Sequence, residues 1–396
     1  MQIGKTGIVG AGTMGSSIAV ALVSRGYPVI LKDKNEDCLR AGIGRVDRLL
    51  GSQITRGLPR EEAAAMRNLI APTTDYSAFA ELDFVIEAVS EDIELKATVL
   101  QELDECCNVN AILATNTSSL AVSRLAARTR RPDKVVGMHF FNPAHLMKLV
   151  EVISGLDTSA DTIHTVIDFA QRIGKLAIRV DECPSFLVNR LLGRFLNESV
   201  WCLNETDISI EDLDSAACSY AMSIGPLALR DKIGLDAGLS VSEFNFKEYG
   251  ERFRPARLLE AMVKENLLGQ KLGRGFYLYD SQTRKKTTAN PQVKEIMAQL
   301  NGSAASRQPF QVERLFLPMI NEAFLALQEK VCEAADLDLA LMSALGMQKG
   351  PLAIASEIGL AECLKEIEAL FDSLGERFRP APLLKRYVWA RRTVMM

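Results

Sequence analysis

The chain has 396 residues, of which 48% are hydrophobic and 24% charged, so it is typical of a folded globular protein with two or three domains. Its 46 basic and 50 acidic side chains give a net charge of −4, which excludes a general affinity for nucleic acid or for an anionic membrane. No apolar run reaches the ~20 residues that cross a bilayer. A glycine-rich turn at Gly10 leaves no room for a signal peptide, so a cytoplasmic protein is expected.

The eight cysteines are scattered along the chain and form no C-x-x-C motif. This spacing predicts free thiols in a reducing compartment, without a disulfide framework and without a metal site. Only three histidines are present, so any mechanism that needs an imidazole has few candidates: His139, His145 and His164.

Short β-rich runs alternate with helical stretches over residues 1–183. The expected buried strands lie at 8–9, 29–31, 84–88, 111–114 and 135–138, and the stretches between them include helices at 14–25 and 93–106. This alternation predicts an α/β Rossmann-type domain, with a parallel sheet covered by helices on both faces.

A G-x-G-x-x-G motif follows the first expected strand and opens an amphipathic helix. In this context the motif is typical of dinucleotide binding. Gly10 allows the tight turn, Gly12 lets a pyrophosphate approach the backbone, and Gly15 allows close packing of helix on strand. Thr13 and Met14 belong to the same cofactor-binding turn. The N-terminus of the helix supplies amide donors and a favourable dipole for phosphate groups.

Asp33 ends the second expected strand, 18 residues after Gly15. A carboxylate there accepts hydrogen bonds from an adenosine ribose 2′-hydroxyl and repels a 2′-phosphate, so the predicted cofactor is NAD rather than NADP. Lys32 and Lys34 flank Asp33 and would weaken this preference if they faced the same site. The alternative interpretation is a glycine turn that binds no nucleotide.

The chain beyond residue 184 is mostly helical and repeats itself. Gly225–Ala228 recurs at Gly350–Ala353, and Gly250–Ala256 recurs at Gly375–Ala381, both 125 residues later. One offset over seven identical residues indicates a duplication rather than a short-period solenoid. We therefore expect two tandem all-α domains, joined by a linker with a short helix near 292–300. The predicted bounds are 184–281 for the first copy, 282–308 for the linker and 309–396 for the second copy.

Four further stretches follow one another with characteristic spacing: Thr115–Leu120, Gly137–Pro143, Leu149–Ile153 and Phe186–Arg190. With these motifs the chain resembles the 3-hydroxyacyl-CoA dehydrogenases of fatty-acid β-oxidation. The tandem helical copies resemble the dehydrogenase portion of the bacterial multifunctional β-oxidation subunit. The resemblance implies NAD-dependent, reversible oxidation of (S)-3-hydroxyacyl-CoA to 3-oxoacyl-CoA, with an acyl-CoA as the partner substrate.

Oxidation of a secondary alcohol needs a base for the hydroxyl proton, and an imidazole suits this role near neutral pH. His139 lies just past a predicted strand, at the carboxyl edge of a parallel sheet where ligands bind. Glu151, twelve residues later on a strand-like run, would hydrogen-bond the other ring nitrogen and orient the base.

Five further site residues are assigned by the resemblance. It implies that Ser118 and Asn189 hydrogen-bond the substrate oxygen that changes between alcohol and ketone. It places Glu91 and Lys96 on the nicotinamide ribose side, and Asn116 is assigned to the cofactor with them. In place of the lysine-rich helix with which many family members grip the CoA phosphate, this chain has Arg40, Arg45 and Arg48.

Two other functions stay open at this point. The first is the same chemistry on another β-hydroxy acid or on a CoA-free substrate. The second is a sensor or scaffold that binds NAD without catalysis, against which the intact His139 and Glu151 argue.

The repeat also predicts the assembly. In relatives with one helical domain, the resemblance implies pairing of that domain between two subunits. Here one chain carries both copies, and the 27 residues from 282 to 308, as a flexible chain, span about 25–30 Å. We expect a monomeric pseudo-dimer with one NAD site, in which the second copy is structural because Glu313 stands where the first copy has Asn189.

Overall fold

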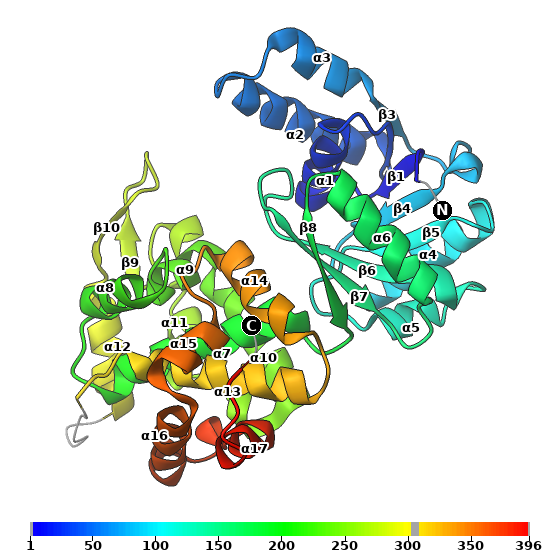
Figure 1. Ribbon diagram of the computed structural model, residues 1–396. Coiled ribbons are helices and arrows are strands. Elements are labelled where there is room, and N and C mark those ends of the chain that lie inside the picture. Colours follow the sequence, from blue (N-terminus) through cyan, green and yellow to red (C-terminus); the bar gives the residue numbers. More distant parts are fainter. Residues whose placement is uncertain (1–2, 302–308, 395–396) are drawn as a thin grey trace. The chain divides into compact units, whose positions relative to one another are not determined.

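The computed structural model describes residues 3–301 and 309–394 (Figure 1). Two compact units divide the chain, Met1–Phe186 and Leu187–Met396, and each is described by itself. Within the described residues, no helix combines the length and the apolar character needed to span a membrane.

An eight-stranded sheet forms the centre of the first unit, in the order β3-β2-β1-β4-β5-β6-β7-β8. Its strands are β1 (Thr6–Val9), β2 (Val29–Lys32), β3 (Ile70–Thr73), β4 (Phe84–Glu87), β5 (Ile112–Thr115), β6 (Val135–Phe140), β7 (Leu149–Ser154) and β8 (Leu176–Asp181). The neighbours from β3 to β6 are parallel, as expected. The next strand along the chain, β7, runs antiparallel to β6, so the complete sheet is mixed. Residues 141–148 are too few for the crossover that a parallel neighbour needs, so the chain folds straight back.

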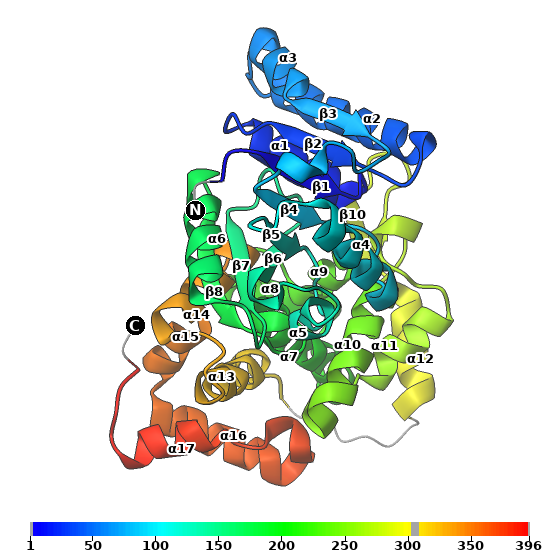
Figure 2. The same cartoon turned by 90° about the vertical axis from the view of Figure 1, so that its right-hand side faces the viewer.

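Helices cover both faces of this sheet (Figure 2). They are α1 (Thr13–Val23), α2 (Glu36–Ile54), α3 (Arg60–Asn68), α4 (Ile93–Cys106), α5 (Val122–Ala126) and α6 (Ala160–Arg172), with single 3₁₀ turns η1 (Phe79–Glu81) and η2 (Pro132–Lys134). Apolar side chains of α1, α2 and α6 form one core with alternate strand residues such as Ile86 and Val136. Helices α4 and α5 contact β4, β5 and β6 outside that core.

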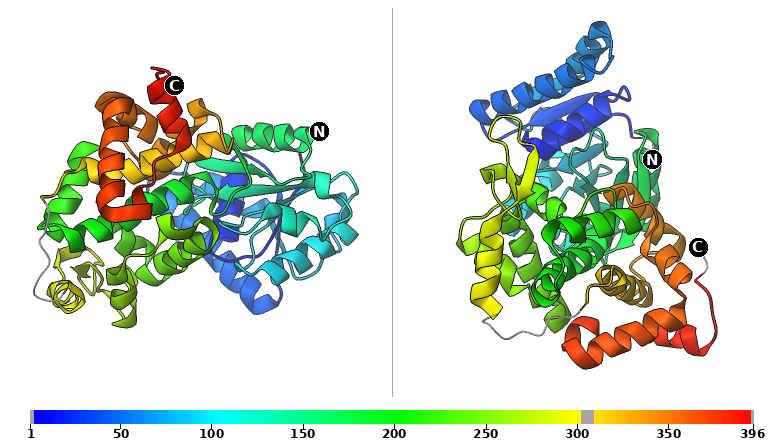
Figure 3. Two further views of the ribbon diagram at one scale, coloured as in Figure 1. Left: turned by 90° about the horizontal axis from the view of Figure 1, so that it is seen from below. Right: turned by 90° about the vertical axis from the view of Figure 1, so that its left-hand side faces the viewer.

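The second unit consists of two runs of helices in the same order (Figure 3). The first run is α7 (Phe186–Glu205), α8 (Ile210–Tyr220), α9 (Pro226–Ile233), α10 (Leu235–Tyr249), η3 (Gly250–Phe253) and α11 (Arg257–Lys264). The second run is α13 (Glu313–Gln328), α14 (Ala334–Leu345), α15 (Pro351–Ile358), α16 (Leu360–Leu374), η5 (Gly375–Phe378) and α17 (Pro382–Trp389).

Equivalent hydrogen bonds also repeat between the two runs. The Asp214 carboxylate accepts hydrogen bonds from the first amides of α9, and the Asp338 carboxylate does the same for α15. Carboxylates at helix N-termini satisfy orphan amides and complement the helix dipole. The duplication seen in the sequence is therefore a duplication of local structure.

The stretch predicted as a flexible linker is largely folded onto the first run. After a 3₁₀ turn, η4 (Gln270–Leu272), strand β9 (Tyr277–Tyr279) pairs with β10 (Lys286–Ala289). Helix α12 (Pro291–Asn301) then packs against α11 and buries Val293, Ile296 and Met297, which confirms the short helix. The random-walk span estimated for residues 282–308 does not apply to these elements, because apolar spacing of i, i+3, i+4 gives α12 a face to bury. Residues 302–308 lie outside the described residues.

Candidate active site

The glycine turn lies between β1 and α1, at the centre of the sheet. Gly10 has a φ of +103°, which favours glycine, and a Cβ there would come 2.6 Å from the Ala88 carbonyl oxygen. A Cβ on Gly15 would overlap the Gly10 carbonyl oxygen, so this glycine allows α1 to pack on the turn. A Cβ on Gly12 would meet no atom within 4 Å. The turn thus leaves open space beside the N-terminal amides of α1, as a phosphate group requires.

Asp33 holds this turn from the end of β2. One carboxylate oxygen of Asp33 accepts a hydrogen bond from the Ala11 amide at 2.8 Å, and the other accepts one from the Lys34 amide at 2.7 Å. The ammonium of Lys32 lies 4.1 Å from the ring centroid of Tyr76, in a cation–π contact. Lys32 is therefore engaged with Tyr76 and leaves the charge of Asp33 in place.

A cavity of about 460 Å³ opens at the carboxyl ends of β1, β4, β5 and β6. In doubly wound sheets, ligands bind at this edge, where the strand order reverses. Seven of the predicted site residues line it: Gly12, Thr13, Met14, Glu91, Asn116, Ser118 and His139.

His139 and Glu151 meet because β6 and β7 are antiparallel. The register pairs the two residues directly across the strands, and His139 Nδ1 lies 2.7 Å from Glu151 Oε2. Glu151 is fully buried, His139 is 6% exposed, and the rings of Phe141 and Phe186 lie 4.6 and 5.7 Å from the imidazole. With Nδ1 held by a carboxylate, Nε2 is the ring nitrogen left for proton transfer.

Glu91 organises the loop that carries Ser118. Its Oε1 accepts hydrogen bonds from the Thr117 hydroxyl at 2.6 Å, the Ser118 amide at 2.8 Å and the Ser118 hydroxyl at 3.1 Å. Burial raises the pKa of Glu91, but the nearby Lys96 ammonium and the hydrogen bonds from Thr117 and Ser118 outweigh it and hold the pKa below its usual range. Glu91 is thus a carboxylate that fixes the end of β5.

Lys96 lies beneath this loop and does not line the cavity. Its ammonium, in a side chain 1% exposed, lies 2.9 Å from Glu87 Oε1, 3.4 Å from Glu91 Oε2 and 3.2 Å from the Val89 carbonyl oxygen. Glu87 is fully buried and also accepts a hydrogen bond from the Thr115 hydroxyl at 2.6 Å. Lys96 therefore contacts Glu91, which lines the cavity, and its direct contact with a cofactor stays a prediction.

Sequence reasoning missed Glu87. The available signal was an acidic residue at the end of a buried apolar strand, which requires a buried partner. Asn116, by contrast, was assigned to the site, and the structure shows how it is held. Its side-chain oxygen accepts a hydrogen bond from the Phe140 amide at 2.9 Å, which ties the end of β5 to β6.

The remaining predicted residues lie at different places. Arg45 of α2 donates to the Ala11 carbonyl oxygen at 3.2 Å and so supports the glycine turn, whereas exposed Arg40 pairs with Asp37 at 3.4 Å. Asn189 is half-buried on α7 in the second unit, so its approach to the substrate stays a prediction.

The glycine turn at the switch point of the sheet, with Asp33 behind it, defines a nucleotide-binding domain of the NAD-dependent dehydrogenase class. Comparison with known families is more specific. The 3-hydroxyacyl-CoA dehydrogenase NAD binding domain matches residues 5–183. The 3-hydroxyacyl-CoA dehydrogenase C-terminal domain matches residues 186–279 and again 310–394. The chain belongs to the 3-hydroxyacyl-CoA dehydrogenase family and is an NAD-dependent oxidoreductase.

Individual relatives agree with this membership. The chain is 32% identical over 390 residues to the fatty acid oxidation complex subunit alpha of Shewanella amazonensis, a match that covers 97% of this chain and 55% of the relative. The chain thus spans about half the length of that curated relative.

Two solved structures are also similar. The 3-hydroxybutyryl-CoA dehydrogenase of Escherichia coli K12 is 30% identical, with a TM-score of 0.88, over 98% of this chain and 99% of its own. The (S)-3-hydroxybutyryl-CoA dehydrogenase PaaH1 of Ralstonia eutropha is 40% identical, with a TM-score of 0.68, over 71% of this chain and 100% of its own. The predicted family, the Rossmann-type fold followed by a helical region, the enzyme class and the cofactor NAD are confirmed.

Proposed function

We propose that this chain catalyses the reversible oxidation of (S)-3-hydroxyacyl-CoA to 3-oxoacyl-CoA, as a cytoplasmic enzyme of fatty-acid β-oxidation. The observation that carries the proposal is the His139–Glu151 pair, 2.7 Å apart, at the edge of a cavity that the glycine turn also lines. The names of the similar solved structures, which are 3-hydroxybutyryl-CoA dehydrogenases, support an acyl-CoA substrate.

His139 serves as the general base in this proposal. Its Nε2 removes the hydroxyl proton, while Glu151 fixes the tautomer through Nδ1 and stabilises the imidazolium that forms. Ser118 and Asn189 hydrogen-bond the reacting oxygen. Gly12 and Asp33 would hold NAD, which when bound supplies the hydride acceptor. Burial of the pair beside Phe141 and Phe186 keeps competing water away from the imidazole.

NADH oxidation with acetoacetyl-CoA tests the activity. The proposed enzyme should turn over acetoacetyl-CoA and leave acetoacetate nearly untouched at the same concentration, because the CoA moiety contributes binding energy. Comparable rates with both would favour the alternative, a CoA-free β-hydroxy acid. No turnover of either, with NADH still bound, would favour a sensor or scaffold.

Preference for NAD over NADP should be about 5–150-fold in kcat/KM, since charge repulsion at Asp33 is worth about 1–3 kcal/mol. Asp33→Asn should narrow the ratio, because asparagine keeps an acceptor for the Ala11 amide and loses the charge. Steady-state kinetics at fixed ionic strength measure the ratio of kcat/KM for NAD and NADP in the unmodified protein and in the variant. Equal use of NADPH by the unmodified protein would contradict the assignment.

We further propose that the two helical domains, 184–281 and 309–396, form a pseudo-dimer within one monomer. Support comes from ion pairs that repeat across the two copies. Arg190 of α7 lies 2.7 Å from Glu322 of α13, and the equivalent Arg314 of α13 lies 2.8 Å from Glu198 of α7. All four side chains are at least nine-tenths buried. A reciprocal set of contacts is the signature of a two-fold interface.

Arg194 gives this interface one asymmetric member. Its guanidinium donates to the carbonyl oxygens of Arg252 and Arg377, which occupy equivalent positions in η3 and η5. Because the Arg194 guanidinium bonds to two equivalent carbonyl oxygens, it lies near the pseudo-two-fold axis. If the other copy also had an arginine at this position, the two guanidinium groups would clash at the axis. The equivalent position in α13 is Pro318, which carries no charge. This asymmetry favours pairing within the chain over pairing of identical copies.

The protein should sediment as a monomer of about 43.5 kDa and bind one NADH per chain. The second copy is structural in this proposal, because Glu313 occupies the position of Asn189. Sedimentation equilibrium and calorimetric titration measure the two quantities. A tight dimer formed through the helical domains, or two NADH per chain, would refute the pseudo-dimer.

A further inference from the structure

One buried arginine of the second unit has no acidic partner. Five arginines of the described residues, 3–301 and 309–394, are buried. Four of them form ion pairs with carboxylates: Arg190, Arg194, Arg314 and Arg377. The fifth, Arg230 of α9, is 3% exposed, and its Nε and Nη2 are buried without a hydrogen-bond partner in the same ranges.

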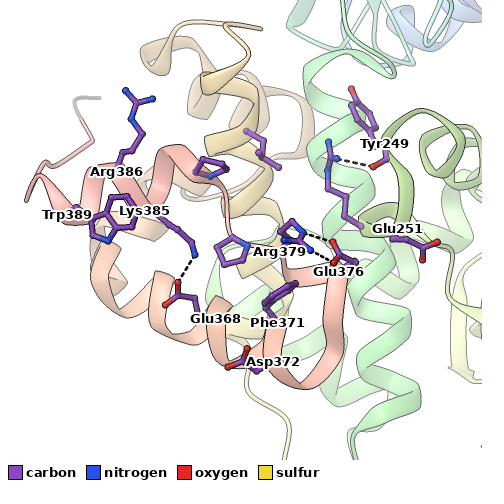
Figure 4. Close-up of a pocket in the computed structure, with 14 residues that line it drawn as sticks. Tyr249, Glu251, Glu368, Phe371, Asp372, Glu376, Arg379, Lys385, Arg386 and Trp389 are labelled. Carbon is purple, nitrogen blue, oxygen red and sulfur yellow. Dashed lines mark hydrogen bonds and ion pairs between the residues drawn. The ribbon is translucent and has the colours of Figure 1, made fainter.

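Two partly exposed cations of the same unit show the contrast. In a groove of about 750 Å³ beside α16 and α17, Arg379 pairs with Glu376 (Figure 4). Lys385 pairs with Glu368 in the same groove, at 2.9 Å. Arg230 is far more buried and has no such carboxylate. Burial lowers the pKa of Arg230 to about 10, which still leaves the guanidinium charged at neutral pH, so its burial without an anion lowers the stability of the fold.

The repeated structure does not require an arginine at this position. The guanidinium of Arg230 lies over Gly238 of α10, because a Cβ on Gly238 would lie 3.0 Å from Arg230 Nη1. The duplication relates Arg230 to Ala355 and Gly238 to Cys363. Ala355 and Cys363 are both fully buried, so the equivalent helices of the second copy pack together without a charge. Arg230 therefore has a purpose other than holding α9 against α10.

Exposed aliphatic side chains flank this guanidinium on both helices. Ile233, three residues after Arg230 on α9, is 46% exposed, and Val241, three residues after Gly238 on α10, is 40% exposed. Residues three apart lie on the same face of a helix. A buried cation between exposed aliphatic groups fits a ligand with an anionic end and an aliphatic body. One guanidinium balances the single charge of a carboxylate, whereas a phosphate dianion would bury an excess charge.

Arg230 and Asn189 are connected by the packing of α10 on α7. A Cβ on Gly193 of α7 would lie 3.3 Å from Asn245 Nδ2 of α10. Asn189 lies one turn before Gly193 on the same face of α7. Gly238 lies two turns before Asn245 on the same face of α10. The guanidinium over Gly238 therefore belongs to the same pair of helix faces as the amide that is assigned to the reacting oxygen.

We propose that Arg230 binds a carboxylate at the far end of the substrate's acyl chain, so that the preferred substrates are CoA esters of 3-hydroxy dicarboxylic acids. The inference rests on the proposed function, in which Asn189 of the same helical copy contacts the reacting oxygen. Arg230 is then a specificity-determining residue: it discriminates between acyl chains by their far end and takes no part in the transfer of the proton or the hydride. The carboxylate supplies the anion that the protein itself does not place beside Arg230.

Reduction of 3-oxoacyl-CoA by NADH in the full-length protein tests this preference. Acyl chains of six, eight and ten carbons are each compared as the methyl-terminated and the carboxylate-terminated compound. At the length that reaches Arg230, we expect kcat/KM to be at least about tenfold higher for the carboxylate-terminated compound, because hydrogen bonds to a charged group replace an unpaired guanidinium. Arg230→Met should lower this ratio to about one or below. Arg230→Lys keeps a cation and should restore part of the ratio.

Lys232→Met is the matched control, because it removes an exposed cation from the same helix. It should leave both the rate and the ratio unchanged. Urea denaturation detects a structural role: Arg230→Met removes an unpaired buried charge and should not lower the urea midpoint, whereas the loss of a structural arginine would lower it. A ratio near one at every chain length in the unmodified protein, or an unchanged ratio in Arg230→Met, would overturn the proposal.

Calorimetric titration with acyl-CoAs that lack the 3-oxo group measures the same preference without turnover. Turnover of the methyl-terminated compounds, with no preference for a carboxylate in either experiment, would overturn the role of Arg230 and leave the proposed function in place. Preferential binding of the carboxylate-terminated compounds that Arg230→Met abolishes, without turnover of any 3-oxoacyl-CoA, would instead support the role of Arg230 and contradict the proposed function.

Discussion

Replacement of His139 by glutamine is expected to lower kcat by about 10²-fold or more and to leave NADH affinity within about twofold. Glutamine keeps a side chain of similar reach but cannot accept the substrate proton. Glu151, the partner of His139 across β6 and β7, holds the imidazole through Nδ1 at 2.7 Å. The glycine turn lies on other strands, so the substitution removes the base and leaves the turn in place. Stopped-flow turnover and calorimetric NADH titration separate the two effects.

Glu151→Gln is the companion variant. It should also slow turnover and move the acid limb of the pH–rate profile to lower pH, because the imidazolium loses its counter-charge. A purely structural role for Glu151 would lower the amount of folded enzyme without moving that limb. If either variant kept the original kcat, the assigned role of that residue would be wrong.

Replacement of Glu322 by alanine is expected to destabilise the second unit by about 3–5 kcal/mol, because it leaves buried cations without their carboxylate. Glu322 is fully buried, with Arg190 at 2.7 Å, Arg252 at 3.2 Å and Arg194 at 3.7 Å. Urea denaturation followed by circular dichroism measures the change. The control is Glu251→Ala, which removes an exposed pair with Arg254 and should change stability little.

The same carboxylate predicts a pH dependence. Burial raises the pKa of Glu322, but the surrounding arginines outweigh it and lower the pKa below its ordinary value. A lowered pKa in the folded state means that the stabilisation is fully present above the unfolded-state pKa and is lost as the pH falls through the folded-state pKa. The difference in the free energy of unfolding between the original protein and Glu322→Ala should therefore disappear at acidic pH. A difference in the free energy of unfolding that did not change with pH would contradict an ion-pair origin of this stabilisation.

The sequence was sufficient to predict the residues of the cofactor half of the site, because these residues follow one another along the chain in a local pattern. The glycines and Asp33 lie at the ends of neighbouring strands, and any parallel sheet brings such residues together. His139 and Glu151 were also predictable as a pair, although the cause of their contact is the antiparallel register of β6 and β7, which the sequence did not indicate.

Other features depend on burial, which a single sequence does not display. Lys96 was predicted as a cofactor contact, yet its ammonium lies among Glu87, Glu91 and the Val89 carbonyl oxygen. The polar composition of residues 282–301 hid three buried apolar side chains of α12. Both features have one physical cause: a charged or polar stretch becomes part of the core when the fold supplies partners for it.

Fusion of two copies in one chain changes how the centre of the helical unit can mutate. In a dimer of identical subunits, a substitution at the two-fold axis is present in both subunits. The new side chain must therefore pack against its own copy. Here Arg194 and Pro318 occupy equivalent positions with different chemistry, so a substitution on one side is made only once. Each copy is free to diverge while the other keeps the shared contacts, and an inherited duplication becomes a source of two different surfaces.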